Sequence, residues 1–248
     1  MKIVVLGGTG RIGARVVALL AERGHQAVAA SRSTGVDAVA GTGLDTAFAG
    51  ADVVVDATES SAWDEAGVIE FFTTATGNVL AAEERAGVGH HVALSIVGID
   101  RNPEARGYLA GKVVQERLVA ESPVPSTIVR ATQFFEFLPQ IADASTVDGE
   151  VRIGTALMQP VAAEAVARAL AEAAEARTAG AIEVAGPERA PLAEFLRRDL
   201  SDRGDARAVV VDPAAGYFGR VVGETSLVPV KDDAVIDAVG YEEWRAAS

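Results

Sequence analysis

The sequence contains no cysteine, only three histidines, and few aromatic residues, which make up 5% of its 248 positions. The absence of cysteine excludes disulfide bonds, thiolate zinc sites and thiol catalysis, and a cytoplasmic location is expected. Three histidines without a cluster of acids or cysteines form no metal-binding pattern, so no metal is expected. No apolar segment reaches the roughly 20 residues that cross a bilayer, so no membrane association is expected.

Positive charge is also scarce. The chain has 22 lysines and arginines against 35 aspartates and glutamates, a formal net charge of -13. Such a chain has no general attraction for polyanions, so neither nucleic acid nor an anionic membrane surface is expected as a partner. Phosphate groups must instead be bound by local arrangements of donors. The expected partner is a small-molecule substrate, and homodimer formation is left open.

Short runs rich in valine and isoleucine alternate with helical patterns through the first half of the chain. The runs are residues 3–7, 26–32, 52–58, 90–97 and 126–132. The spacing of apolar residues predicts helices over 11–23, 64–85 and 108–121, the second interrupted near Gly77. This alternation predicts an α/β fold, a Rossmann-type doubly wound parallel sheet with right-handed crossovers. A short extra strand is expected before residues 90–97, which would make that run the fifth strand.

The pattern loosens after about residue 149. Strands are predicted in VRIGTAL, AIEVAG and RAVVVDP, and helices over 162–177 and 191–203. No linker rich in proline, glycine or serine separates the two parts. We therefore expect a core over residues 1–149 and a small C-terminal substrate-binding lobe over 150–248, packed on the core instead of folding independently.

The stretch KIVVLGGTGRIG places Gly7, Gly10 and Gly13 between a predicted strand and a predicted helix. Small residues let the chain turn tightly and approach phosphates, and the helix N-terminus offers unpaired amides and a positive dipole end. The alternative is a tight turn without a ligand. We expect residues 1–149 to be an NAD(P)-binding core. The residues expected to contact the dinucleotide are Gly7, Thr9, Gly10, Arg11, Ile12 and Gly13, with Ala57 and Thr58 after the third predicted strand.

The end of the second predicted strand reads Ser31, Arg32, Ser33. An enzyme that uses NAD commonly has Asp or Glu here, which binds the ribose hydroxyls. Arg32 is suited to pair with a 2′-phosphate while Ser31 or Ser33 donates a hydrogen bond, and Arg11 adds positive charge. The alternative for both arginines is a solvated surface charge. The pattern favours NADP(H) as the cofactor.

A second group of residues follows the run at 90–97. Tyr108 and Lys112 are four apart on a predicted helix and share a face, and Ser95 lies near the end of the preceding strand. Together with the glycine run, this resembles the short-chain dehydrogenase/reductase superfamily. The resemblance implies that Tyr108 donates or accepts the proton that accompanies hydride transfer. It also implies that Lys112 lowers the pKa of Tyr108 and holds the nicotinamide ribose, and that Ser95 donates to the substrate oxygen. The alternative is a purely structural role for all three.

The segments GGTGRIG, NVLAAEERAGVGHHVALSIVGID and STIVRATQFFEF resemble the atypical, NmrA-like branch of that superfamily. The branch includes NADPH-dependent quinone and isoflavone-type reductases and redox-sensing regulators, and its tyrosine is often dispensable or absent. Where the main branch has Asn-Asn-Ala-Gly after its fourth strand, this chain has Asp56, Ala57, Thr58 and Glu59. The resemblance therefore implies cofactor binding more firmly than it implies a reaction.

Aromatic residues follow the run at 126–132, at the sheet edge where ligands of open α/β sheets bind. Gln133, Phe134, Phe135 and Phe137 are candidates for a hydrophobic substrate pocket, and packing of the lobe on the core is the alternative. The sequence predicts an NADPH-dependent oxidoreductase that transfers hydride to a small, largely apolar carbonyl or quinone-type substrate. A non-catalytic NADP(H) sensor that binds a protein partner, and an epimerase or isomerase that retains NADP, are the alternatives.

Overall fold

The computed structural model of the chain describes residues 1–62, 64–102, 105–218 and 222–247. The chain divides into two compact units. Unit 1 consists of residues 1–130 and 164–182, and unit 2 of residues 131–163 and 183–248. The division therefore differs from the single boundary expected at residue 149, because residues 164–182 return to the first unit.

A seven-stranded sheet has the strand order β12-β9-β5-β4-β3-β1-β2. Its strands are β1 (Lys2–Leu6), β2 (Gln26–Ala30), β3 (Val53–Asp56), β4 (His90–Ile96), β5 (Ser126–Ala131), β9 (Gly180–Ala185) and β12 (Val235–Ile236). β1 pairs in parallel with β2 on one side and with β3 on the other, so the strand order reverses at β1. In open α/β sheets this reversal marks the crevice where ligands bind. The predicted Rossmann-type parallel sheet is confirmed.

The five runs expected as strands are β1 to β5. The run at 90–97 is β4 and not a fifth strand, because it pairs directly with β3, with Val55 opposite Val92. The described chain between β3 and β4 forms α3 (Glu65–Ala86) instead of an extra strand. The break expected near Gly77 is also absent from α3. A Cβ added at Gly77 would meet nothing within 4 Å, so this glycine costs the helix about 1 kcal/mol without interrupting it.

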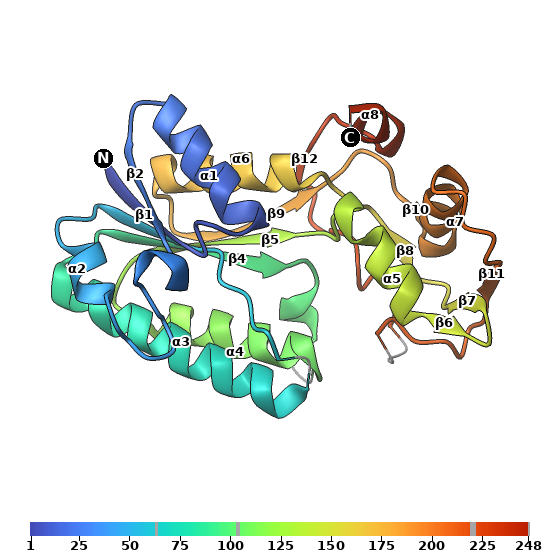
Figure 1. Cartoon of the computed structure of the whole chain (residues 1–248), viewed down its shortest axis with the longest axis horizontal. Helices are drawn as coiled ribbons and strands as arrows, with labels where there is room; N and C mark the ends of the chain where they lie inside the picture. Colours follow the sequence, from blue (N-terminus) through green and yellow to red (C-terminus); the bar gives the residue numbers. More distant parts are fainter. Residues whose placement is uncertain (63, 103–104, 219–221, 248) are drawn as a thin grey trace. The chain divides into compact units, whose positions relative to one another are not determined.

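Helices cover both faces of the sheet in unit 1 (Figure 1). They are α1 (Arg11–Glu22), α2 (Leu44–Phe48), α3, α4 (Tyr108–Glu121) and α6 (Ala163–Ala176), with 3-10 turns η1 (Arg32–Thr34) and η2 (Ile99–Arg101). In Figure 1, α1 and α6 lie above the sheet, and α3 and α4 lie below it. α1 buries the stripe formed by Ile12, Val16 and Leu20, as its apolar spacing predicts. β3 is buried along its whole length, which explains why it reads as a continuous valine run.

Unit 2 contains short strands and three helices around its own core. Its remaining elements are η3 (Phe135–Phe137), α5 (Leu138–Ala144), β6 (Thr146–Val147), β7 (Glu150–Ile153), β8 (Leu157–Met158), β10 (Ala190–Pro191), α7 (Leu192–Asp202), β11 (Val209–Val211) and α8 (Tyr241–Ala247). Strands β11, β7 and β6 form one small sheet, and β10 and β8 form another. The helices predicted over 162–177 and 191–203 are confirmed as α6 and α7, whose ends differ by one residue each.

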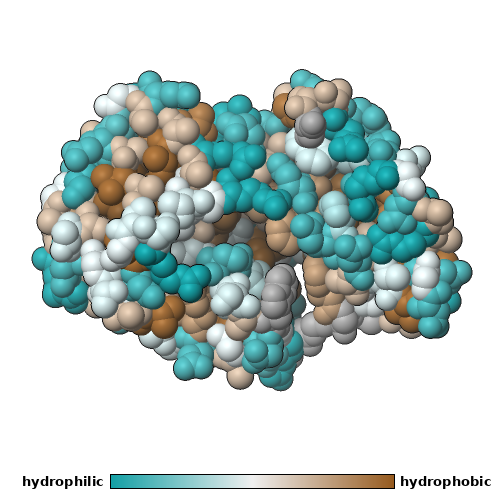
Figure 2. Space-filling view, in the orientation of Figure 1, coloured by the Kyte–Doolittle hydropathy of each residue, from teal (hydrophilic) through white to brown (hydrophobic). Residues whose placement is uncertain are grey.

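Hydrophilic side chains cover most of the face drawn in Figure 2, where hydrophobic residues occur in small separate groups. None of the helices in the described part of the chain has the length and apolar character needed to cross a membrane. The expected cytoplasmic location stays a prediction.

Candidate active site

The loop after β1 is tightly packed at two of its predicted glycines. Gly7 has a φ of +70°, and a Cβ there would lie 2.5 Å from the carbonyl oxygen of Ala57. A Cβ at Gly13 would lie 2.7 Å from the carbonyl carbon of Gly7. Both positions therefore require glycine for packing alone, because backbone atoms surround them. Gly8, which the spacing did not single out, is crowded in the same way, 2.7 Å from the Cα of Ala29.

Gly10 is less crowded than Gly7, Gly8 and Gly13. A Cβ there would meet only the carbonyl oxygen of Gly7, at 3.1 Å. Gly10 is the N-cap of α1, no side chain of the described chain caps the helix there, and its first turn contains no acidic residue. The first amides of a helix are unpaired and carry partial positive charge. This uncapped end fits the diphosphate of a dinucleotide, which would supply the missing negative charge.

Hydroxyl groups link the glycine loop to the end of β2. Thr9 Oγ1 donates to Ser31 Oγ at 3.0 Å, and the hydroxyl oxygens of Ser31 and Ser33 are 2.8 Å apart. Ser31 begins the η1 turn, where its backbone amide donates to Thr34 Oγ1 at 2.9 Å. Arg32 is exposed on the same turn. The expected residues of the two strand ends therefore lie together, and the residues around them fit a ribose phosphate.

The chain after β3 supports the glycine loop from the other side. Ala57 lies against Gly7, and the cofactor contact expected of it stays a prediction. Asp56 is buried, and its Oδ1 accepts hydrogen bonds from the backbone amide of Thr58 at 2.9 Å and from its hydroxyl at 2.6 Å. The hydroxyl of Thr58 is therefore engaged with Asp56 in this structure.

Lys112 is buried in α4 and belongs to a polar network that links this helix to β4 and β3. Its Nζ donates to the backbone oxygen of Leu94 at 3.0 Å and to Gln115 Oε1 at 2.8 Å. It also lies 4.5 Å from the ring centroid of Phe72. Gln115 Nε2 donates in turn to Asp56 Oδ2 at 2.9 Å. The hydrogen bonds of Lys112 in the described chain therefore go to Leu94 and Gln115, and not to Tyr108.

Electrostatic effects on Lys112 and Tyr108 work against the expected phenolate. Burial lowers the pKa of Lys112, and the carboxylates of Glu59, Asp56 and Glu116 oppose this effect. Burial raises the pKa of Tyr108 well above its ordinary value, and the carboxylate of Glu59 raises it further. Tyr108 therefore holds its proton at neutral pH, where it is a hydrogen-bond donor.

The hydroxyl of Tyr108 donates to Glu59 Oε2 at 2.9 Å. The other oxygen of Glu59 accepts from the amide of Ser60 at 3.0 Å. The start of α4 is held to α3, because the amide of Gly107 donates to Glu65 Oε2 at 2.7 Å. The phenol thus lies next to a carboxylate that directly follows β3, at the same sheet edge as the glycine loop.

Ser95 lies in a separate network of buried charges. Its Oγ donates to Glu116 Oε1 at 2.5 Å. Arg130 holds both oxygens of Glu116, with Nε donating at 3.0 Å and Nη2 at 2.7 Å, and its Nη1 donates to Asp100 at 2.7 Å. While this arrangement persists, the proton of Ser95 is directed to Glu116 and not to a substrate oxygen. The substrate contact expected of Ser95 stays a prediction.

Several residues of these networks were missed as site residues, among them Glu59, Gln115, Glu116 and Arg130. Gln115 and Glu116 follow Lys112 by three and four positions, so helical spacing places them on the same side of α4 and would have found them. Glu59 stands in the segment that departs from the superfamily pattern, which was a signal for an altered site.

The candidate substrate residues belong to unit 2. Phe135 is fully buried, and its ring centroid lies 5.7 Å from that of Tyr241 and 5.3 Å from that of Trp244. Phe135 thus belongs to the hydrophobic core of unit 2, and its role in a substrate pocket stays a prediction. Phe134 and Phe137 are half-buried with centroids 6.3 Å apart, and their pocket role stays a prediction.

Gln133, His90 and His91 are polar residues with buried side-chain atoms. Gln133 Oε1 is buried without a hydrogen-bond partner among the described residues, and its substrate role stays a prediction. His90 and His91 are buried within β4. His91 Nδ1 lies 2.7 Å from Glu83 Oε1. In the described ranges, no group of three or more histidines and acids is arranged to hold a metal ion.

Comparison with known proteins places the chain among NAD(P)H-binding proteins. A family model described as NAD(P)H-binding matches residues 7–177. The (4-alkanoyl-5-oxo-2,5-dihydrofuran-3-yl)methyl phosphate reductase of Streptomyces griseus is 32% identical over 210 residues, covering 75% of this chain and 68% of that protein.

Solved structures share the fold at low identity. The Bordetella bronchiseptica enzyme WbmH in complex with NAD+ is 16% identical with a TM-score of 0.72, covering 100% of this chain and 96% of that chain. A hypothetical dTDP-4-dehydrorhamnose reductase from Sulfolobus tokodaii is 17% identical with a TM-score of 0.67, covering 98% of this chain and 99% of that chain. The predicted NAD(P)-binding protein with a Rossmann-type fold is thus confirmed. Membership of the short-chain dehydrogenase/reductase superfamily and of its NmrA-like branch stays a prediction.

Proposed function

The chain belongs to the NAD(P)H-binding family, and we propose that it is an NADPH-dependent oxidoreductase that reduces a small, largely apolar carbonyl or quinone-type compound. The observation that carries the proposal is the hydrogen bond between Tyr108 and Glu59. Glu59 follows β3 by three residues, and Ala57 in the same segment supports Gly7 of the glycine loop. A proton-bearing phenol therefore stands at the sheet edge that carries the dinucleotide loop, as reduction of an oxygen-containing group requires.

The cofactor, when bound, supplies the hydride. The uncapped first turn of α1 at Gly10 would bind its pyrophosphate. Arg32, with Ser31 and Ser33, would bind the phosphate that distinguishes NADP from NAD. The absence of Asp and Glu from this turn supports the choice of NADP.

The environment of Tyr108 indicates which substrates fit. A phenol whose pKa is raised by burial and by Glu59 is a weak acid. Such a phenol readily protonates a simple alkoxide, which is strongly basic, but it is a poor proton donor to a weakly basic oxygen. Reduction of quinones and conjugated carbonyls gives stabilised anions, so these substrates depend least on protonation by Tyr108. The name of the Streptomyces griseus relative describes a ring carbonyl compound with an alkanoyl group, which supports the carbonyl class for this chain.

The proposal is tested by following NADPH absorbance with a panel of quinones, conjugated carbonyls, aldehydes and ketones. Turnover of at least one member of the panel is expected. NADPH binding without turnover of any member would overturn the enzyme assignment.

A non-catalytic NADP(H) sensor is the second candidate, and a specific observation favours it. Ser95 donates to Glu116, and Lys112 donates to Leu94 and Gln115, so neither is directed to Tyr108 in this structure. A sensor needs only the glycine loop and the Arg32 turn, and the panel assay separates the two candidates.

Replacing Arg32 with alanine is expected to weaken NADPH binding by about 10- to 100-fold and to leave NADH binding unchanged, because one charged hydrogen bond to phosphate contributes roughly 1.5–3 kcal/mol. Fluorescence titration of both nucleotides measures the change. Arg85→Ala is the matched control, since Arg85 pairs with exposed Asp45 on the surface. Equal losses for the two nucleotides would contradict an NADP-specific contact.

Replacing Glu59 with glutamine is expected to shift the alkaline limb of the pH–rate profile to lower pH. A reductase that uses Tyr108 as its proton donor loses activity as the pH rises through the pKa of the phenol. Glu59 raises that pKa, so removing its charge lowers it. Tyr108→Phe is the companion variant, and its turnover of simple aldehydes and ketones should fall by about 100-fold. An unchanged alkaline limb in Glu59→Gln would count against proton donation by Tyr108.

A further inference from the structure

Gln115 stands between two buried charges of unit 1, the ammonium of Lys112 and the carboxylate of Asp56. Lys112 Nζ donates to Gln115 Oε1 at 2.8 Å, and Gln115 Nε2 donates to Asp56 Oδ2 at 2.9 Å. Lys112, Gln115 and Asp56 are 4%, 0% and 1% exposed. Because so little of these residues reaches solvent, water cannot replace the partners of this hydrogen-bond chain, and the protein itself decides which group donates to which.

Donors and acceptors can follow one another in only one order along this chain. An ionised carboxylate only accepts hydrogen bonds, and an ammonium only donates them. Asp56 therefore takes the amide nitrogen of Gln115, which leaves the amide oxygen for Lys112. The second hydrogen bond of Lys112 goes to the backbone oxygen of Leu94 at 3.0 Å. An ammonium has three N–H groups, so one of them has no oxygen acceptor in the described part of the chain.

Three carboxylates act on the charge of Lys112, and Asp56 differs from the other two. Asp56 ends β3, Glu59 follows that strand, and Glu116 lies on α4, and all three oppose the effect of burial, which lowers the pKa of Lys112. Glu59 and Glu116 accept hydrogen bonds from other side chains of the site. Among these three carboxylates, only Asp56 is linked to Lys112 through Gln115.

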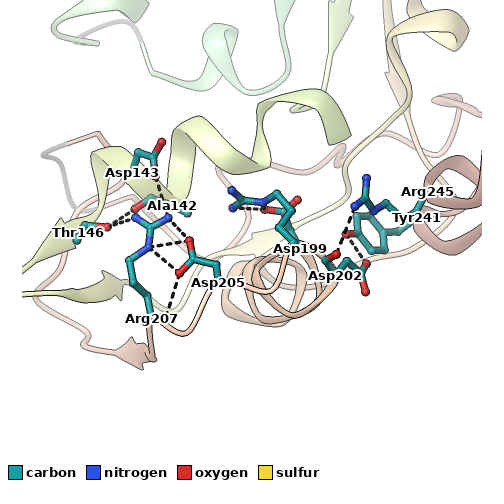
Figure 3. Close-up of polar contacts among 10 residues, drawn as sticks. Ala142, Asp143, Thr146, Asp199, Asp202, Asp205, Arg207, Tyr241 and Arg245 are labelled. Carbon is teal, nitrogen blue, oxygen red and sulfur yellow. Dashed lines mark hydrogen bonds and ion pairs between the residues drawn. The ribbon is translucent and has the colours of Figure 1, made fainter. Parts of the chain in front are cut away.

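The amide between the two charges is a distinctive feature, because several other cations of the chain contact carboxylates directly. Figure 3 shows Arg207 of unit 2, whose guanidinium lies 2.6 Å from Asp205 and 2.9 Å from Asp143. The hydrogen bonds of Arg207 lower the pKa of Asp205 to about 2. Attraction between charges falls with distance, so a carboxylate held beyond an amide neutralises an ammonium less than one in contact. Lys112 thus keeps more of its charge for a ligand than a directly paired lysine would.

Asp56 also joins Lys112 to the support of the glycine loop. Its Oδ1 accepts from the amide of Thr58 at 2.9 Å and from the hydroxyl of Thr58 at 2.6 Å. Ala57, between these two residues, packs against Gly7. One carboxylate therefore holds both the segment behind the glycine loop and the ammonium on α4.

We propose that Asp56 and Gln115 are positioning residues, which hold the ammonium of Lys112 in place and leave one of its N–H groups for the dinucleotide. The inference rests on the proposed function, in which unit 1 binds NADPH. A ribose hydroxyl is an acceptor that suits this N–H group, and NADPH and NADH both carry it. Loss of the hydrogen-bond chain should therefore weaken both nucleotides alike, whereas loss of Arg32 should weaken NADPH alone.

NMR of the chain labelled at its lysine side-chain nitrogens tests the arrangement without a cofactor. The sequence has three lysines, Lys2, Lys112 and Lys231, so three signals are expected, and Lys112→Met identifies the signal of Lys112. In the wild type, this signal should be that of an ammonium at neutral pH. A neutral amine there would overturn the proposal before any other variant is made.

Two variants break the chain on different sides of the amide. Asp56→Asn removes the charge and keeps an oxygen for Thr58, and Gln115→Met replaces the amide with an apolar side chain of similar length. Each should lower the pH at which Lys112 loses its proton by about one unit, because the ammonium loses a group that favours its charged form. Circular dichroism shows whether each variant is folded, and either folded variant is sufficient for the test.

Fluorescence titration of the same variants measures the consequence for the cofactor. Asp56→Asn and Gln115→Met should weaken NADPH and NADH by about 10-fold each, with the ratio of the two affinities unchanged. Asp45→Asn is the matched control, since its carboxylate is 71% exposed on the surface of unit 1. It should leave the titration of Lys112 in place and both affinities within about twofold.

The two measurements separate failure of the inference from failure of the proposed function. A wild type that binds both nucleotides while the titration of Lys112 is the same in Asp56→Asn and Gln115→Met overturns the positioning role alone. Normal binding of both nucleotides by these variants overturns it as well. A wild type in which Lys112 depends on Asp56 but neither nucleotide binds would refute the cofactor site and, with it, the use of the remaining N–H group.

Discussion

Replacing Gly13 with alanine is expected to abolish NADPH binding, with a loss of affinity of at least 100-fold. The added Cβ would lie 2.7 Å from the carbonyl carbon of Gly7 and 2.9 Å from the Cα of Gly8. Both are backbone atoms, so the clash is relieved only by moving the glycine loop or the start of α1. Either movement displaces the uncapped amides at Gly10 that we propose as the pyrophosphate site. Overpacking of this kind also costs about 1–3 kcal/mol of folding stability.

Fluorescence titration with NADPH and thermal unfolding measure the two effects of Gly13→Ala. Gly77→Ala is the matched control, because Gly77 lies inside α3 and a Cβ there has nothing within 4 Å. This control should bind NADPH normally and gain up to about 1 kcal/mol of stability from better helix propensity. Normal NADPH binding by Gly13→Ala would show that the loop is not the cofactor site.

Replacing Arg130 with methionine is expected to destabilise the protein by about 3–5 kcal/mol, because removal of one partner leaves buried charges uncompensated. The side chains of Arg130 and Glu116 are 9% and 11% exposed, and their closest nitrogen–oxygen distance is 2.7 Å. Asp100 loses its 2.7 Å ion pair in the same variant. Because Glu116 lies on α4, the helix that carries Tyr108 and Lys112 should lose part of its anchoring to β5. Urea unfolding followed by circular dichroism measures the change.

The double variant Arg130→Met, Glu116→Met separates the loss of a buried pair from simple loss of packing. Two apolar side chains leave no buried charge at this pair, so the double variant should be more stable than Arg130→Met alone. Arg85→Met removes an ion pair whose side chains are 58% and 71% exposed, and it should change stability by less than about 1 kcal/mol. A double variant as unstable as Arg130→Met would rule out uncompensated charge as the cause.

Local patterns in the sequence were enough to predict the sheet and the first glycine contacts. The valine runs of β1 to β5 and the helical spacing of α1 and α4 depend on short stretches of chain, and the structure differs from them by a residue or two. The tight packing at Gly13 is similarly local, because the atoms that crowd it belong to Gly7 and Gly8 of the same loop, whereas Gly7 is crowded by Ala57 from the segment after β3. Gly8 escaped notice because the residue it meets, Ala29, lies on the neighbouring strand.

The same limit applies to the contacts at the candidate site. The sequence does not distinguish Phe135 from Phe134 and Phe137. Of these three residues only Phe135 is fully buried, and its ring packs against aromatic rings of α8. The hydrogen-bond partner of Ser95 could not be predicted from the sequence either. Ser95, Glu116 and Arg130 come from β4, α4 and β5, which meet only because these strands are neighbours in the sheet.

The sequence by itself determined the fold class, the glycine loop and the helical face shared by Tyr108 and Lys112, because periodicity and spacing act within one element. Only the tertiary structure decided which groups those side chains contact: Glu59 for Tyr108, and Gln115 and Leu94 for Lys112. Hydrogen-bond partners and cavities depend on which elements pack side by side and how deeply, which no local pattern specifies.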